Sequence, residues 1–161
     1  MLLRTKVAVG SVVPEDDELL DSRLTLSVAF DGSESISEAR DAARRFMIEL
    51  QVVHGVPVSD RALGMVELVV SELVTNAYKF APGPCLLDVK LVDGALEVGV
   101  WDTDPTLPTA SPADPGRAGR HGLEIVMVVC RSVEMRREPV GKRVVATIAL
   151  GDDPESTLPA A

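Results

Sequence analysis

The sequence predicts a two-layer α/β sandwich of the α+β class, with helices packed on one face of a mixed, largely antiparallel sheet. The first observation is that segments of strand periodicity occur as neighbouring pairs, with helical segments inserted between them. The second is the composition of the 161 residues, which are 46% hydrophobic but only 3% aromatic, as expected for one domain with an aliphatic core. We expect this domain to span residues 22–150, between a leader of residues 1–21, whose acidic run favours partial disorder, and a loose polar tail of residues 151–161.

The first periodic segments predict a strand followed by a helix. Apolar residues alternate with small or polar ones over residues 24–30, which is the period of a strand buried on one face. Residues 37–53 then carry alanines and larger apolar side chains at helical spacing, and Gly55 follows as a helix stop.

A second helix and a hairpin come next. Ser59 can cap a helix that runs to about Phe80 along a continuous apolar stripe. Two alternating runs, residues 86–92 and 95–101, are joined by Asp93-Gly94, a dipeptide that strongly indicates a β-hairpin.

The last part of the domain contains a long loop, a helix and a closing pair of strands. Residues 103–118 include four prolines and are too long for a simple connection, so we expect a functional or mobile loop that acts as a lid. Residues 119–122 open a helix, and residues 133–137 and 143–150 are predicted to be the closing strands.

Charge and cysteine usage argue against several classes of function. Sixteen Lys and Arg against twenty-five Asp and Glu give a net charge of −9, which repels a phosphate backbone, so no direct nucleic-acid partner is expected. Cys85 and Cys130 have no Cys-x-x-Cys spacing, which argues against a zinc site or a disulfide framework. Neither a signal-peptide run nor a stretch of about 18 uncharged apolar residues occurs, so we expect a cytoplasmic protein without a membrane span.

Glu72 and Asn76 are the first candidate site residues. They lie four residues apart in the second predicted helix, so their side chains share one face at the edge of the apolar stripe. Magnesium prefers oxygen ligands and often shares ATP phosphates, so the amide oxygen of Asn76 can be the main protein ligand. Glu72 could then polarise a nucleophile. Two solvated surface residues are the alternative interpretation.

Asp102 is the second candidate, because it stands where an apolar strand ends. A carboxylate there can accept a hydrogen bond from the exocyclic amine of adenine, with the strand as a wall for the base. The alternative is a turn-forming Asp before Pro105.

The third candidate is a glycine-rich loop over residues 116–123 that leads into a helix. Small residues let backbone N–H groups converge on phosphate oxygens, and the helix N-terminus and the arginines, Arg117 and Arg120, favour the same anion. A Rossmann fingerprint is disfavoured because a proline-rich loop, not a strand, precedes the glycines. A P-loop is disfavoured because its Gly-Lys-Ser/Thr ending is absent. A flexible linker is the alternative interpretation of the loop. A protonated His121 could help to bind the anion, and the alternative is a loop histidine without a role.

Together these motifs resemble the histidine-kinase-like ATPase superfamily. Residues 72–77 resemble its N box, residues 102–105 the start of its first glycine box, and residues 119–123 its second. The residues of these motifs, together with Gly-Lys-Arg-Val-Val at residues 141–145, are most similar to those of the anti-sigma-factor serine/threonine kinases of actinobacteria. The resemblance covers residues 24–150 and implies a Bergerat-type ATP-binding fold.

The resemblance also implies a role for each matching residue. Asn76 would ligate Mg²⁺, Glu72 would act as the base, and Asp102 would hold adenine. The phosphates of ATP would lie at the second glycine box, whose residues are Gly119, Arg120, His121, Gly122 and Leu123. Asp104 would also line the nucleotide site, although it stands, like Thr106, where the fuller family pattern has glycine, which makes the loop stiffer and adds a negative charge near the phosphates.

The leading functional hypothesis is a protein serine/threonine kinase that binds Mg-ATP, phosphorylates an anti-sigma-factor antagonist and holds a sigma factor in an alternative complex. The altered first glycine box favours a different class, a nucleotide-binding partner-switching module without kinase activity. An ATP hydrolase without a protein substrate is a third hypothesis. A homodimer is expected because similar proteins are often homodimers.

Overall fold

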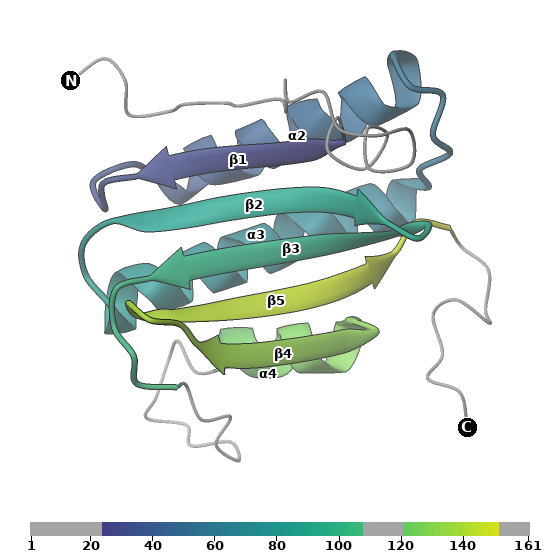
Figure 1. Cartoon of the computed structure of the whole chain (residues 1–161). Helices are drawn as coiled ribbons and strands as arrows, with labels where there is room; N and C mark the ends of the chain where they lie inside the picture. Colours follow the sequence, from purple (N-terminus) through teal and green to yellow (C-terminus); the bar gives the residue numbers. More distant parts are fainter. Residues whose placement is uncertain (1–23, 108–120, 152–161) are drawn as a thin grey trace.

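The computed structural model describes residues 24–107 and 121–151, which form a five-stranded sheet with three helices on one face (Figure 1). The strands are β1 (Thr25–Phe30), β2 (Cys85–Val92), β3 (Ala95–Asp102), β4 (Ser132–Arg137) and β5 (Lys142–Ala149). The helices are α2 (Ile36–Val52), α3 (Asp60–Phe80) and α4 (His121–Val129). The predicted two-layer sandwich is therefore confirmed, and every predicted strand and helix in this part of the chain is present.

The sheet has the order β1-β2-β3-β5-β4, and all its described pairings are antiparallel. The prediction had allowed a mixed sheet. The β2–β3 turn has positive φ at both central residues, 49° at Asp93 and 75° at Gly94, as a tight hairpin with right-handed twist requires. This turn was correctly predicted from the Asp-Gly dipeptide.

Both long helices begin at a serine cap. The Ser35 hydroxyl accepts a hydrogen bond from the backbone N–H of Glu38, and the Ser59 hydroxyl accepts one from that of Ala62. The cap at Ser59 fixes the start of α3, and the apolar spacing decides which of its residues face the sheet.

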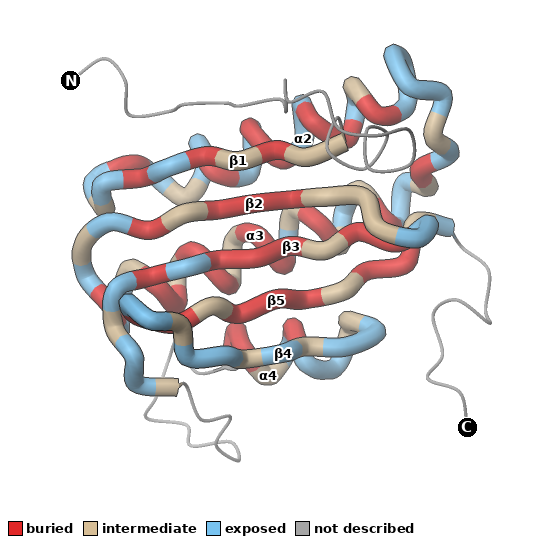
Figure 2. Tube along the Cα trace, viewed as in Figure 1, coloured by how far each residue is buried: buried red, intermediate tan, exposed pale blue. Residues whose placement is uncertain are grey.

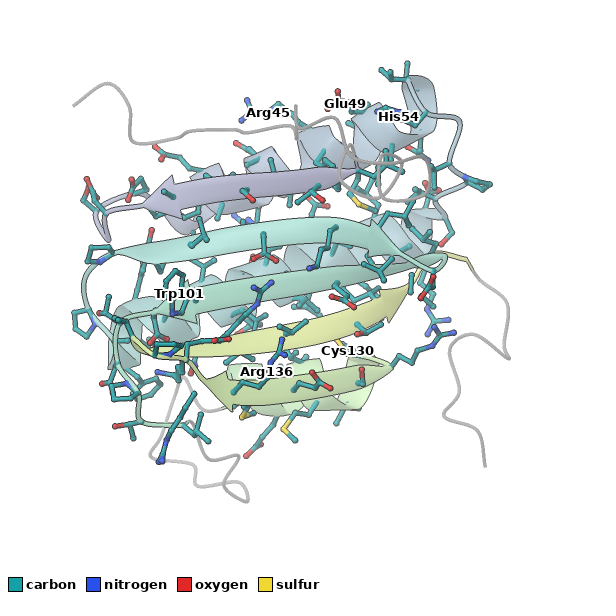
Figure 3. All side chains as sticks on the ribbon, viewed as in Figure 1. Arg45, Glu49, His54, Trp101, Cys130 and Arg136 are labelled. Carbon is teal, nitrogen blue, oxygen red and sulfur yellow. The ribbon has the colours of Figure 1, made fainter. Side chains whose placement is uncertain are left out.

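The core lies between the helices and the sheet, as the buried segments in Figure 2 indicate. Its largest fully buried side chains are aliphatic, as predicted, and include Met47, Leu50, Leu87, Leu96 and Ile148. The opposite face of the sheet carries more exposed side chains, including Trp101 and Arg136 (Figure 3). No helix in the described part of the chain is long and apolar enough to cross a membrane.

The topology brings one end of α3 to one end of the sheet. The helix ends at Phe80, and β2 begins five residues later at Cys85. Cys85 pairs with Asp102, the last residue of β3. The C-terminal part of α3 and the end of β3 therefore lie at the same end of the molecule (Figure 1).

Candidate functional site

Helix α3 presents Glu72 and Asn76 one turn apart, as the sequence predicted. Asn76 is buried, with 8% of its surface exposed, and Glu72 is half-buried. Neither side chain has a hydrogen-bond or ion-pair partner among the described residues. Since no described residue binds the Asn76 amide, its oxygen is available to a ligand.

The first turn of α4 lies directly against Glu72. A Cβ atom added at Gly122 would overlap Oε2 of the Glu72 carboxylate, so only glycine fits there with Glu72 in its present position. Leu123, the next residue, is buried with 3% of its surface exposed, which anchors the start of the helix in the core. The end of the glycine-rich loop, the third candidate, therefore packs on Glu72 of the first, and the positive end of the α4 dipole lies beside a carboxylate.

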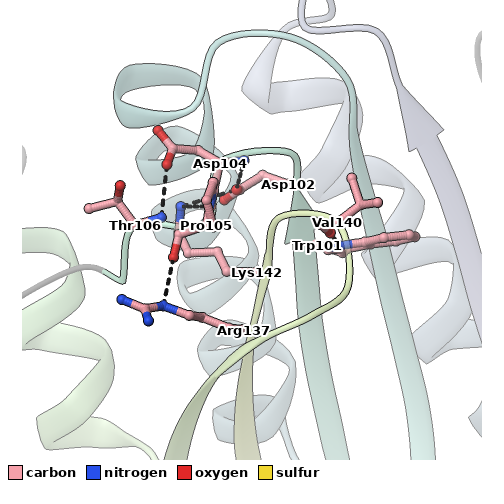
Figure 4. A network of polar contacts seen from close by, with 8 residues as sticks. All are labelled: Trp101, Asp102, Asp104, Pro105, Thr106, Arg137, Val140 and Lys142. Carbon is pink, nitrogen blue, oxygen red and sulfur yellow. Dashed lines mark hydrogen bonds and ion pairs between the residues drawn. The ribbon is translucent and has the colours of Figure 1, made fainter.

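Asp102 occupies the end of β3 on the face covered by the helices. It is 4% exposed, and its Oδ1 atom accepts hydrogen bonds from the Lys142 ammonium at 3.0 Å and from the Asp104 backbone N–H at 2.9 Å (Figure 4). Its Oδ2 atom has no hydrogen-bond partner in the described part of the chain. One oxygen is fixed by the protein, and the other remains available as an acceptor.

Lys142 was missed by the sequence reasoning, which gave it no role. The alternation of the last strand could have indicated it, because extending that strand by one residue puts Lys142 on the inward-facing side with Val144, where the structure pairs it with Asp102. A charged residue at such a position needs a partner of opposite charge.

The segment that follows β3 is held in place by several contacts. The carboxylate of Asp104 accepts a hydrogen bond from the Thr106 backbone N–H at 2.8 Å, and this bond lowers the pKa of Asp104. The carbonyl oxygen of Asp104 accepts a bond from Lys142 at 3.0 Å, and that of Pro105 accepts one from Arg137 at 3.3 Å. The first residues of the predicted lid loop are thus hydrogen-bonded to the β4–β5 hairpin.

The rest of that loop, residues 108–118, lies outside the described residues, as do Gly119 and Arg120 of the predicted phosphate loop. His121 begins α4.

Cys85 lies across from Asp102 and is buried. Burial, with a smaller contribution from the Asp102 charge, raises the pKa of the Cys85 thiol to about 11. The thiol is therefore protonated near neutral pH, and we assign it no nucleophilic role.

The contact between Gly122 and Glu72 can be tested by adding a methyl group. Gly122→Ala should displace the carboxylate, whereas Gly64→Ala in α3 meets nothing within 4 Å and should stabilise the protein by about 0.5–1 kcal/mol, the usual gain for a helical glycine. Chemical denaturation should show a smaller gain, or a loss, for Gly122→Ala. Equal gains for the two variants would argue against the contact.

A comparison with protein families adds an independent finding. The family model described as the histidine kinase-like ATPase domain matches residues 33–148, a range that contains all the site residues discussed above. No curated protein matches the chain.

Proposed function

Because the chain belongs to the histidine kinase-like ATPase domain family, we propose that it binds Mg-ATP and transfers the γ-phosphoryl group to a Ser or Thr of an antagonist protein, as an anti-sigma-factor-type regulator. The observation that carries this proposal is the packing of Gly122 against Glu72, one turn from the buried Asn76. It brings a helix N-terminus to a carboxylate that lies one turn from an amide with no partner among the described residues.

The residues at this end of the sheet fit a nucleotide with a bound magnesium ion. Asp102 offers Oδ2 to an exocyclic amine, and the N-terminal turn of α4 offers backbone N–H groups to phosphate oxygens. No cluster of three or more His, Cys, Asp or Glu suited to a metal occurs among the described residues, and this site needs only one protein ligand, the amide oxygen of Asn76. Magnesium, when bound, would neutralise part of the phosphate charge.

Glu72 would act as the general base. The hydroxyl oxygen of the substrate Ser or Thr would form its bond to the γ-phosphorus as the bond to the leaving ADP oxygen breaks, and the hydroxyl proton would pass to the Glu72 carboxylate. That carboxylate has no competing ion pair in the described part of the chain, which supports its availability as a proton acceptor. Phosphoryl transfer depends mainly on positioning and charge neutralisation, so this set of groups is sufficient.

A second candidate function is a nucleotide-binding module that switches partners without phosphoryl transfer. The observation in its favour is that the carbonyl oxygens of Asp104 and Pro105 accept hydrogen bonds from the β4–β5 hairpin. Asp104, whose carboxylate also binds the Thr106 N–H, stands where the family pattern has a flexible glycine. Incubation with labelled ATP and candidate antagonist proteins separates the two functions. Label on the antagonist supports the kinase, and nucleotide binding without label supports the module.

Asn76→Ala should remove the dependence of ATP binding on magnesium, because the amide oxygen is the proposed ligand. ATP titrations at increasing Mg²⁺ concentration should show a clear rise in affinity for the wild type and little rise for the variant. An unchanged magnesium dependence would remove Asn76 from the metal site.

A further inference from the structure

Lys142 is a buried lysine at the end of the sheet where Asp102 lies. Its residue exposure is 3%, and the side chains of Lys142 and Asp102 are each 4% exposed. The ammonium donates to Oδ1 of Asp102 and to the carbonyl oxygen of Asp104, both at 3.0 Å (Figure 4). Lysine is almost never buried so completely unless it is paired, and a buried pair often contributes little to net stability compared with apolar residues. Its position therefore calls for an explanation other than stability.

The β4–β5 turn is shaped to bring Lys142 to Asp102. Gly141 has a φ of 78°, and an added Cβ atom would overlap the carbonyl oxygen of Asp102, so only glycine fits where the turn meets the end of β3. On the other side of the sheet the indole N–H of Trp101 donates to the carbonyl oxygen of Val140 at 2.7 Å. The turn is thus attached to β3 by Lys142 on the inner face and by Trp101 on the outer face.

The two contacts of Lys142 act on the same small region. One fixes Oδ1 of Asp102, which leaves Oδ2 as an acceptor with no hydrogen-bond partner among the described residues. The other fixes the backbone two residues further along, where the loop begins. Without the ammonium, a carboxylate with 4% of its side chain exposed would have only one remaining donor, the Asp104 N–H, and no opposite charge beside it among the described residues.

We propose that Lys142 is a positioning residue for base recognition: by holding Asp102 and the start of the loop, it sets the preference of the site for a nucleotide whose base carries an exocyclic amine. This inference rests on the proposed function, since it presupposes that Asp102 contacts the base. Lys142 acts through Asp102, so its removal should affect nucleotides with the amine and spare those without it.

The test compares ATP with ITP, in which a carbonyl oxygen replaces the amine. Wild type should bind ATP more tightly than ITP. Lys142→Met, of similar length but without charge, should weaken ATP binding by roughly tenfold or more, the usual effect of losing a charge-assisted hydrogen bond, and should leave ITP binding nearly unchanged. Lys90→Met is the matched control, because Lys90 pairs with Glu97 at 4.0 Å in a half-exposed position on the same sheet, and it should change neither affinity.

Other outcomes separate the alternatives. Equal losses for ATP and ITP would indicate a merely structural Lys142 and overturn the inference, as would an unchanged preference for ATP. A wild type that binds neither nucleotide would overturn the proposed function itself. If Lys142→Met is too unstable, the comparison moves to Asp102→Asn with and without Lys142→Met. The double variant has no unpaired buried charge, and the single variant is measured at a temperature where its thermal melt shows it to be folded. The two should bind ATP equally, and a further loss in the double variant would show that Lys142 does not act through Asp102.

Discussion

Glu72→Gln is expected to lower the rate of phosphoryl transfer by about 10²–10⁴-fold, the usual contribution of a positioned general base, while ATP affinity changes little. The amide is nearly the same size as the carboxylate, so the contact with Gly122 can persist. What is lost is the ability to accept the proton of the attacking hydroxyl. Single-turnover transfer to a cognate antagonist, measured beside an independent ATP titration, gives the two quantities.

The matched control for this variant is Glu67→Gln. Glu67 is another half-buried carboxylate of α3, so the substitution removes the same charge from the same helix away from Gly122. It should leave both transfer and ATP binding intact. Nearly unaffected transfer in Glu72→Gln would show that Glu72 is not the base, and loss of ATP binding together with transfer would assign it to nucleotide or metal positioning.

Asp102→Asn is expected to weaken ATP binding by roughly ten- to more than a hundredfold, equivalent to about 1.5–3 kcal/mol for a charge-assisted hydrogen bond. An asparagine can present a donor to the amine of adenine, where an acceptor is needed. The substitution also removes the charge that faces Lys142, and breaking a buried ion pair costs about 3–5 kcal/mol of stability. Binding must therefore be measured at a temperature where the thermal melt shows a folded variant.

Asp88→Asn separates the two effects. Asp88 is 7% exposed on the outer face of the sheet and accepts from the Arg143 guanidinium at 2.8 and 2.9 Å, so this control also breaks an ion pair of a buried carboxylate. Its stability should fall, but its ATP affinity should not. Equal ATP affinity for wild type and Asp102→Asn would remove Asp102 from the base site.

The fold could be predicted from local signals because each of them acts over a few residues. The Ser59 cap, the apolar stripe of α3 and the Asp93-Gly94 turn are fixed by interactions within one element or one turn. The full antiparallel pairing was harder to predict, since the position of β5 between β3 and β4 depends on contacts between strands far apart in the sequence.

The site could be predicted only in part. Its motifs gave Glu72, Asn76 and Asp102, of which the structure buries the last two and half-buries the first, and their roles stay predictions. The contact between Glu72 and Gly122 and the ion pair between Asp102 and Lys142 join residues far apart in the chain. Such contacts depend on strand register and helix packing, which no spacing within a single motif encodes.

Calorimetric titration of the purified chain with ATP, first with Mg²⁺ and then with a chelator, tests most directly whether this end of the sheet is a nucleotide site. We expect saturable binding in the presence of Mg²⁺ and a marked loss of affinity when the ion is removed. No saturable binding under either condition, from a chain whose thermal melt shows it to be folded, would contradict the assignment of Asn76, Asp102 and the α4 N-terminus to Mg-ATP.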